Sequence, residues 1–298
     1  MRYVEAGGVR VSAIGLGTWQ FGSREWGYGK DYAANVAGPI VRRALELGMN
    51  LVDTAEIYGF GRSERILGEA IRGRRDEVFV ATKIFPVGLP LMIMRRSAAS
   101  ARRLGIDHID LYQQHWPNPV FPPRATMSRM RKLLDRGFVR HVGVSNHSLA
   151  QWQACDEALG VPVLSNQVRF SLVARDPERE LVPWAQRNDR LVIAYSPLGQ
   201  GLLSGKYMDS APSNFRRVRA DFQPPARERR RPLIEALREI GTVHDATPAQ
   251  VALAWLIRKP NVVAIPGASS VEQLEQNAAA AGIELSDAES NRLDSLSA

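Results

Sequence analysis

The chain has 298 residues, a formal net charge of +8 at pH 7 and one cysteine, so an internal disulfide is excluded and a reducing compartment is expected. No run of about 18 apolar residues is present, and the N-terminus lacks a signal-peptide pattern. We therefore expect a cytoplasmic protein without membrane contact. The arginines are scattered along predicted helix faces, which favours solvated surface over nucleic-acid binding.

Short apolar segments alternate with helix-period segments along most of the chain. The apolar segments cover residues 12–18, 50–54, 78–83, 109–115, 139–145, 163–168, 191–196 and 262–266. The helical segments cover 39–47, 63–72, 95–104, 126–136, 149–159, 177–187, 232–244 and 248–258. Eight βα units of this kind predict an α/β protein with a (β/α)8 TIM barrel, in one domain spanning residues 1–298.

Three further segments complete the predicted fold. The sequence "RYVEAGGVRVSAI" (2–14) has two alternating runs around a Gly-Gly turn, which predicts a β-hairpin that caps the floor of the barrel. Capping boxes are expected at Thr247 to Gln250 and at Ser270 to Gln273. Cys155 lies in an apolar-periodic segment and is interpreted as a packing residue.

The connection after the seventh strand is unusually long. Residues 196–231 show no regular helix pattern until the end of the segment, whereas loops in compact domains rarely exceed about 15 residues. Because this segment follows a barrel strand, we expect it to cover the C-terminal face, where barrel enzymes carry their active sites.

Polar residues end three consecutive strands of the predicted barrel. Asp53, Lys83 and His115 end the second, third and fourth strands, and Tyr58 follows in the loop after Asp53. Asp53, Lys83 and His115 also have structural interpretations, as a helix cap, a strand-end cation and a satisfied histidine, respectively. At adjacent strand ends, however, they are expected to converge on the catalytic mouth.

This set of residues predicts a proton-donating site. A free tyrosine has a pKa near 10, and a nearby ammonium group lowers it by favouring the phenolate. Tyr58 is therefore a candidate general acid for a carbonyl oxygen, with Lys83 lowering its pKa and Asp53 holding Lys83 in place. His115 would donate a hydrogen bond to the same oxygen. Since none of these groups attacks carbon, a hydride from a nicotinamide would complete the reaction.

The sequence resembles the aldo-keto reductase family along nearly the whole chain. The resemblance rests on "GLGTW" (15–19), "DTAEIYG" (53–59), "ATK" (81–83), "IDLYQQHWP" (109–117), "GVSN" (143–146), "NQV" (166–168), "YSPLGQGLLSGKY" (195–207) and "IPGASSVEQLEQN" (265–277). It implies a monomeric barrel oxidoreductase that reduces aldehydes and ketones with NADP(H), and with NAD(H) less readily, without metal or flavin. The family's catalytic tetrad falls on Asp53, Tyr58, Lys83 and His115.

The resemblance also implies which residues contact the cofactor and the substrate. Ser145, Asn146 and Gln167 match residues that bind the nicotinamide carboxamide, and Tyr195 matches the aromatic that stacks on the ring. The other implied cofactor contacts are Gly17, Thr18, Trp19, Asp53, Ser196, Pro197, Leu198, Gln200, Gly201, Ser269, Ser270, Gln273 and Asn277. The implied substrate contacts are Trp19, Tyr58, His115 and Trp116.

The sequence departs from the family pattern at the turn after the eighth strand. Many relatives carry Lys or Arg there for the 2′-phosphate, whereas this chain has Ser269, Ser270 and Gln273. The N-terminus of the following helix offers backbone N–H groups. The arginines of the long connection are a second candidate source of charge, with solvent exposure as the alternative; they are Arg216, Arg217 and Arg219. The short C-terminal tail predicts an open pocket.

Three other functions compete with carbonyl reduction. An NADPH-binding redox-sensing subunit would keep the barrel and lose most turnover. A Schiff-base lyase would use Lys83 as a nucleophile, but that role needs a neutral amine and Asp53 favours the charged form. A nucleic-acid-binding role rests on net charge alone.

Overall fold

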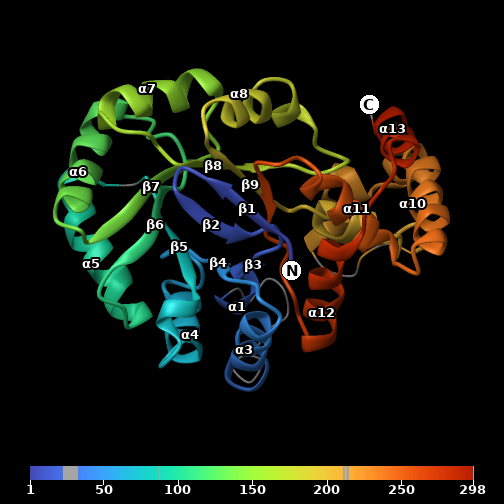
Figure 1. The fold of residues 1–298 in the computed structure, drawn as a ribbon, viewed down its shortest axis with the longest axis horizontal. Coiled ribbons are helices and arrows are strands. Elements are labelled where there is room, and N and C mark those ends of the chain that lie inside the picture. Colours follow the sequence, from blue (N-terminus) through green and yellow to red (C-terminus); the bar gives the residue numbers. More distant parts are fainter. Residues whose placement is uncertain (23–32, 87, 211, 213–214, 298) are drawn as a thin grey trace.

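The computed structural model describes residues 1–22, 33–86, 88–210, 212 and 215–297, and its central feature is a barrel of parallel strands (Figure 1). Neighbouring strands of the barrel follow one another in the chain, and every pairing is parallel. They are β3 (Leu16–Gly17), β4 (Leu51–Asp53), β5 (Phe79–Ile84), β6 (Ile109–Gln114), β7 (Val139–Ser145), β8 (Ser165–Arg169), β9 (Leu191–Tyr195) and β10 (Val262–Ala264). The predicted (β/α)8 barrel is confirmed.

The barrel closes between its first and last strands. Ile14 pairs with Ala264 and Gly17 with Gly267, both in parallel. The strand predicted over residues 12–18 is shortened to Leu16–Gly17, because Ser12 belongs to the hairpin. A Cβ atom on Gly17 would lie 2.7 Å from the carbonyl oxygen of Ile265, so only glycine allows this close approach.

Helices surround the barrel on its outer side (Figure 1). The chain order of the longer helices is α3 (Gly38–Glu46), α4 (Arg62–Ala70), α5 (Ile93–Leu104), α6 (Pro123–Asp135), α7 (Leu149–Leu159), α8 (Leu181–Arg187), α10 (Arg231–Val243), α11 (Pro248–Ile257), α12 (Val271–Ala279) and α13 (Asp287–Leu296). The shorter segments are α1 (Trp19–Gly22), η2 (Ala33–Ala37), η3 (Arg75–Glu77), η4 (Pro90–Met92), η5 (Asp176–Glu178) and η9 (Ala280–Gly282). The predicted capping box at Thr247 and Gln250 is present.

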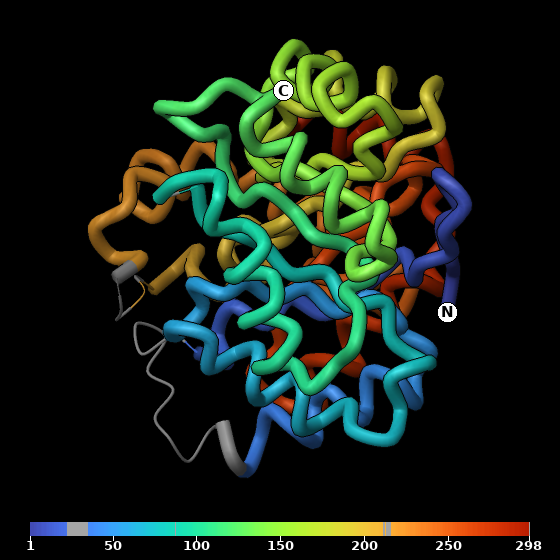
Figure 2. The backbone as a smooth tube through the Cα atoms, turned by 90° about the vertical axis from the view of Figure 1, so that its left-hand side faces the viewer, coloured from blue at the N-terminus to red at the C-terminus, as the bar shows by residue number. Residues whose placement is uncertain are grey.

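A β-hairpin covers the end of the barrel opposite to the long connection. Strands β1 (Tyr3–Ala6) and β2 (Val9–Ser12) are antiparallel, and the turn between them has positive φ at Gly7 and Gly8 (57° and 77°). Gly7 lies against Leu164, just before strand β8 begins, so the hairpin is at the N-terminal end of the strands. Figure 2 shows the hairpin and the segment after β9 on opposite sides of the barrel.

The long connection after β9 is built of short helical segments rather than an irregular loop. They are η6 (Gly199–Ser204), η7 (Phe215–Val218), η8 (Ala220–Phe222) and α9 (Pro224–Arg229). Asp221 binds Arg169, the last residue of β8, at 2.9 Å and Arg230 at 3.0 Å. These ion pairs hold the connection at the C-terminal end of the strands, as predicted.

Cys155 is a buried packing residue of helix α7, as predicted. Burial raises the pKa of its thiol to about 12, with a further contribution from the charge of Asp156. The thiolate, which is the reactive form, is therefore scarce at neutral pH. Within the described part of the chain, no helix has the length and apolar character needed to cross a membrane.

Candidate active site

The four residues predicted to converge do so at the C-terminal mouth of the barrel. Asp53 is the last residue of β4, Lys83 is the fifth residue of β5, and His115 directly follows β6. The parallel register pairs Asp53 with Ala81 and Lys83 with Gln113, so the ends of the three strands lie side by side.

Lys83 is the centre of this site. Its side chain is completely buried, and its ammonium group donates to Asp53 Oδ1 at 2.5 Å and to the carbonyl oxygen of Thr54 at 2.9 Å. The hydroxyl group of Tyr58 lies 3.4 Å from Lys83 Nζ. A buried ammonium group that is paired and hydrogen-bonded in this way stays charged, because the carboxylate and the carbonyl oxygen offset the cost of removing the charge from water.

Two amide side chains hold the carboxylate of Asp53 from its other side. Gln167 Nε2 donates to Asp53 Oδ2 at 2.8 Å, and Gln113 Nε2 approaches the same oxygen at 3.3 Å. Neither Gln113 nor the carbonyl of Thr54 was among the residues predicted for the site. Strand alternation could have found Gln113, because it lies opposite Lys83 in the β5–β6 register and therefore faces the same side.

The electrostatics of the Lys83–Tyr58 pair differ in part from the prediction. Burial lowers the pKa of Lys83, but the charge of Asp53 and the hydrogen bonds more than compensate, so that the pKa of Lys83 is raised. Burial raises the pKa of Tyr58, and the opposing effect of Lys83 does not cancel it. The prediction that Lys83 brings Tyr58 below its usual pKa is therefore wrong for this structure. The phenol holds its proton at neutral pH.

His115 is neutral in this environment. Burial lowers its pKa to about 3, and the positive charge of Lys83 acts in the same direction. Its Nδ1 atom is buried and has no hydrogen-bond partner among the described residues. The imidazole lies edge-on to the ring of Tyr58, with centroids 5.9 Å apart, and edge-on to Phe85 at the same distance. A neutral imidazole can donate one hydrogen bond without repelling Lys83.

The residues predicted to contact a nicotinamide form one hydrogen-bonded group beside the tetrad. Ser145 Oγ donates to the carbonyl of Gln167 at 2.9 Å, and Asn146 Nδ2 donates to the carbonyl of His115 at 3.1 Å. The Tyr195 hydroxyl donates to Asn146 Oδ1 at 2.9 Å. Asn146 has a positive φ of 61°, which is uncommon outside glycine and aims its amide into this group.

The remaining predicted residues near the first and fourth strand ends differ in their exposure to solvent. Thr18 is buried, and its hydroxyl bonds to the carbonyl of Asp53 at 2.9 Å and to Ser63 Oγ at 2.7 Å. Gly17 lies in the sheet. Trp19 and Trp116 are exposed aromatic residues, each next to a strand end of the mouth.

The segment after β9 begins with strained backbone. Ser196 and Gln200 have φ values of 50° and 59°, in the left-handed region that non-glycine residues rarely adopt. Gln200 Oε1 is buried without a hydrogen-bond partner among the described residues. Pro197, Leu198 and Gly201 belong to the same turn. The segment is expected to face a pyrophosphate. A buried amide oxygen without a hydrogen-bond partner is consistent with a site in which a bound polar ligand supplies the missing hydrogen bond.

The turn before α12 is organised differently from the predicted capping box. Ser270 Oγ accepts the N–H of Gln273 at 3.1 Å, as an N-cap does, but the Gln273 amide does not return to Ser270. Instead Gln273 Oε1 accepts the N–H and the hydroxyl of Ser269, both at 2.8 Å. Asn277 is buried and donates to the carbonyl of Gly267 at 3.3 Å. The amide of Gln273 therefore occupies the two donors of Ser269.

The three arginines of the long connection have separate positions. Arg216 Nη1 donates to the hydroxyl of Tyr207 at 3.2 Å, and Arg217 is exposed. Burial raises the pKa of Tyr195, whereas the charges of Arg169 and Arg219 oppose that rise, so the guanidinium of Arg219 lies within electrostatic range of Tyr195. Arg219 is therefore associated with Tyr195, one of the predicted cofactor residues.

The fold and the site, a (β/α)8 barrel with a buried acid–amine pair beside a partly buried phenol at its mouth, define a class of protein. Comparison with known proteins agrees. Residues 13–298 match the model of the Aldo/keto reductase family. The chain is 58% identical to an uncharacterized oxidoreductase of Mycobacterium tuberculosis, over 96% of this chain and 90% of that protein. It is 35% identical to the methylglyoxal reductase YeaE of Escherichia coli, over 97% of this chain and 92% of that protein.

A solved structure agrees with these sequence relatives. The aldo-keto reductase from Klebsiella pneumoniae in complex with NADPH superimposes with a TM-score of 0.82 at 33% identity, covering 99% of this chain and 95% of that chain. The present chain belongs to the aldo/keto reductase family of oxidoreductases. The cofactor class expected from the sequence, NADP(H), is the one that this structural neighbour contains.

Proposed function

We propose that this protein is an NADP(H)-dependent carbonyl reductase that converts aldehydes and ketones to alcohols, with Tyr58 as the general acid. The observation that carries the proposal is the contact between Tyr58 and Lys83, whose hydroxyl and ammonium groups are 3.4 Å apart. It couples a proton donor to a buried positive charge that is itself fixed by Asp53 at 2.5 Å.

The roles of the four residues follow from their charges. The hydride for the carbonyl carbon would come from a nicotinamide held beside these residues. Tyr58 donates its proton to the carbonyl oxygen, and the positive charge of Lys83 stabilises the phenolate that remains. Asp53 keeps Lys83 charged and in position. His115, neutral because its pKa is about 3, donates a hydrogen bond to the same oxygen and orients it.

The side chains beside the tetrad fit a nicotinamide and a dinucleotide. We assign the carboxamide to Ser145, Asn146 and Gln167, and the face of the ring to Tyr195, which is only partly buried although it ends a barrel strand. The pyrophosphate is assigned to the turn from Ser196 to Gly201, and the adenosine end to the turn before α12 with Asn277. Arg219 is the candidate for charge near the cofactor.

The proposed substrates are small carbonyl compounds with an apolar part. Trp19, Trp116 and Phe60 are exposed, and each lies in a segment that follows a barrel strand, Trp19 at the start of α1. Such side chains offer apolar contacts to an aldehyde entering the mouth. The methylglyoxal reductase named among the relatives acts on a compound of the proposed type, a small aldehyde. We further propose a monomer in the cytoplasm.

Turnover is favoured over the alternatives by the state of the tetrad. All four residues are in place, which argues against a redox-sensing subunit that has lost its chemistry. A Schiff-base lyase needs a neutral Lys83, whereas Asp53 raises the pKa of this amine despite its burial. Borohydride trapping of a carbonyl compound on Lys83 would revive the lyase hypothesis.

The test of the proposal is a panel of aldehydes, ketones and sugars with NADPH, followed by the loss of absorbance of the reduced nicotinamide. We expect turnover with simple aromatic and aliphatic aldehydes. If NADPH binds, as shown by fluorescence, but no compound of the panel is turned over, the carbonyl reductase hypothesis is overturned. The redox-sensing subunit would then be the remaining hypothesis.

A further inference from the structure

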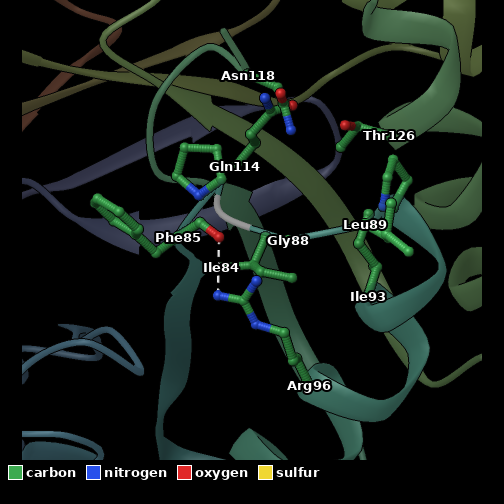
Figure 3. A pocket seen from close by; sticks show the side chains of 11 residues that line it. Ile84, Phe85, Gly88, Leu89, Ile93, Arg96, Gln114, Asn118 and Thr126 are labelled. Atoms are coloured by element: carbon green, nitrogen blue, oxygen red, sulfur yellow. Dashed lines mark hydrogen bonds between the residues drawn. The ribbon is translucent and has the colours of Figure 1, made fainter. Parts of the chain in front are cut away.

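Arg96 of helix α5 connects the loop that carries Tyr58 with the residue that follows strand β5, which carries Lys83. Its guanidinium group binds the carboxylate of Glu56, with Nε 3.2 Å from Oε2 and a closer contact from Nη2 to Oε1. The same Nη2 donates to the carbonyl oxygen of Phe85 at 2.8 Å, and Figure 3 shows this bond. Glu56 Oε1 in turn accepts the N–H of Phe85 at 2.8 Å. We name these three residues the Arg96 clamp.

The clamp is adjacent to the segments that carry Tyr58, Lys83 and His115. Glu56 precedes Tyr58 by two residues, and its N–H donates to the carbonyl of Lys83 at 3.3 Å. Phe85 follows Lys83 by two residues, and its ring packs edge-on against His115 with centroids 5.9 Å apart. The clamp thus touches the segments that carry Tyr58, Lys83 and His115 without reaching the reacting atoms.

The ion pair of the clamp is shielded from solvent. The side chains of Arg96 and Glu56 are 22% and 13% exposed, so screening by water is weaker than for a surface pair. Beside Arg96 lies a small cavity with room for about one water molecule, about 20 Å³, and the buried Gln114 Oε1 on its wall lacks a partner among the described residues. An ordered water there would complete the polar contacts next to the clamp.

A nearly identical ion pair at the other end of the same strands provides a comparison. Arg75 binds Asp110 at 2.7 Å, with side-chain exposures of 22% and 15%, and also donates to the carbonyls of Val78 and His108 at 2.7 and 3.0 Å. Arg75 lies before β5 and Asp110 near the start of β6, at the N-terminal face. In barrel enzymes that face carries stability, whereas the C-terminal face carries catalysis.

We propose that Arg96 and Glu56 are positioning residues for carbonyl reduction, which hold the Tyr58 loop against the end of β5 so that the phenol stays within reach of Lys83. The inference rests on the proposed function. A general acid must lie within hydrogen-bond reach of the atom it protonates, and a displacement of about 1 Å can cost on the order of 100-fold in rate. The clamp acts on the rate of the chemical step and not on cofactor binding.

The experiment compares Arg96→Ala with the matched control Arg75→Ala, using full-length protein, NADPH and an aromatic aldehyde. Arg96→Ala is expected to lower kcat by on the order of 100-fold while the Kd for NADPH, measured by fluorescence, changes by less than about threefold. Arg75→Ala is expected to lower the melting temperature by a similar amount but to keep kcat within about threefold of wild type. Equal kcat values for the two variants would overturn the proposal.

Chemical rescue separates positioning from a general loss of structure. Guanidinium chloride, well below unfolding concentrations, is expected to restore part of the kcat of Arg96→Ala, because the free cation can bridge Glu56 and the Phe85 carbonyl. Sodium chloride and urea at the same concentrations are expected to have no effect. Rescue should disappear in the double variant Arg96→Ala with Glu56→Gln. Failure of guanidinium to raise kcat in a folded Arg96→Ala protein would contradict the clamp.

A conservative variant covers the case in which Arg96→Ala does not fold. Arg96→Lys keeps the charge but cannot make the forked contacts to Glu56 and Phe85, so kcat is expected to fall about tenfold with NADPH affinity unchanged. A wild-type kcat in this variant would overturn the proposal. Inactivity of the wild type itself would instead overturn the proposed function, so the two failures are distinguishable.

Discussion

The hydroxyl group of Tyr58 lies 3.4 Å from the ammonium group of Lys83, at the open end of the barrel. The two residues come from different segments, the loop after β4 and the strand β5, and are brought together by the parallel register. Burial keeps the proton on Tyr58, since it raises the pKa of the phenol more than Lys83 lowers it. The pair therefore consists of a protonated acid and a fixed positive charge.

Replacing the proposed acid tests its role directly. Tyr58→Phe removes the hydroxyl and keeps the ring, so proton donation is lost while the site keeps its shape. We expect kcat for aldehyde reduction to fall by at least about 100-fold, with the Kd for NADPH nearly unchanged. Turnover within about tenfold of wild type, or 1.4 kcal/mol in activation free energy, would rule out Tyr58 as the proton donor.

Lys83 is also predicted to be important for stability. Lys83→Met leaves the carboxylate of Asp53 buried without its cation, although Gln167 and Gln113 still contact it. Breaking such a buried pair costs about 3–5 kcal/mol, so we expect a loss of that order in the free energy of unfolding measured with urea. Arg74→Met, which breaks an exposed pair with Glu77, should leave stability nearly unchanged. Equal stabilities for the two variants would contradict this account.

The lowered pKa of His115 predicts acid sensitivity of the fold. Below pH 6.5 the unfolded chain protonates this histidine, whereas the folded chain does so only near pH 3. The contribution of the neutral His115 to the free energy of unfolding is therefore fully present above pH 6.5 and is lost progressively as the pH falls toward 3. When the pH is lowered from 7 to 5, the free energy of unfolding measured with urea should decrease in both proteins. The decrease should be smaller in His115→Gln than in wild type, by up to about 2 kcal/mol. The same loss in both proteins would contradict a neutral, buried His115.

The turn before α12 predicts weak discrimination between the two coenzymes. Gln273 carries no charge, and its amide oxygen occupies both donors of Ser269. Gln273→Arg would place a cation at this turn, so we expect the KM for NADPH to fall about tenfold with little change for NADH. Steady-state kinetics with each coenzyme measure this. Equal KM values for NADPH and NADH in the wild type would exclude specific binding of the 2′-phosphate.

The convergence of the tetrad could be predicted from sequence because it depends on register. Asp53, Lys83 and His115 stand at the ends of consecutive strands, and a parallel barrel brings such ends together. The pKa of Tyr58 could not be predicted in the same way. Its direction depends on the balance between burial and the charge of Lys83, and burial at a loop position is not visible in a sequence pattern.

Contacts between distant side chains were beyond the reach of the sequence. From its position in a helix, Arg96 would be expected to be one more solvent-exposed arginine. Its partner Glu56 is 40 residues away in the sequence. The Gln273 amide was expected to complete a capping box but reaches Ser269 instead, since one amide can satisfy two donors there. Side-chain choices of this kind depend on tertiary geometry, whereas strand order follows from periodicity.

The central claim is hydride transfer from a nicotinamide to a carbonyl carbon in this site, and deuterium labelling tests it most directly. The wild-type protein would be incubated with NADPH deuterated at C4 of the nicotinamide and an aromatic aldehyde, and the alcohol analysed by NMR and mass spectrometry. The account predicts that deuterium appears on the carbinol carbon in proportion to the NADPH consumed. The measurement is made with each of the two epimers of NADPH that carry deuterium at C4. The account is contradicted if alcohol forms without deuterium from both epimers, or if a folded protein with bound NADPH forms no alcohol.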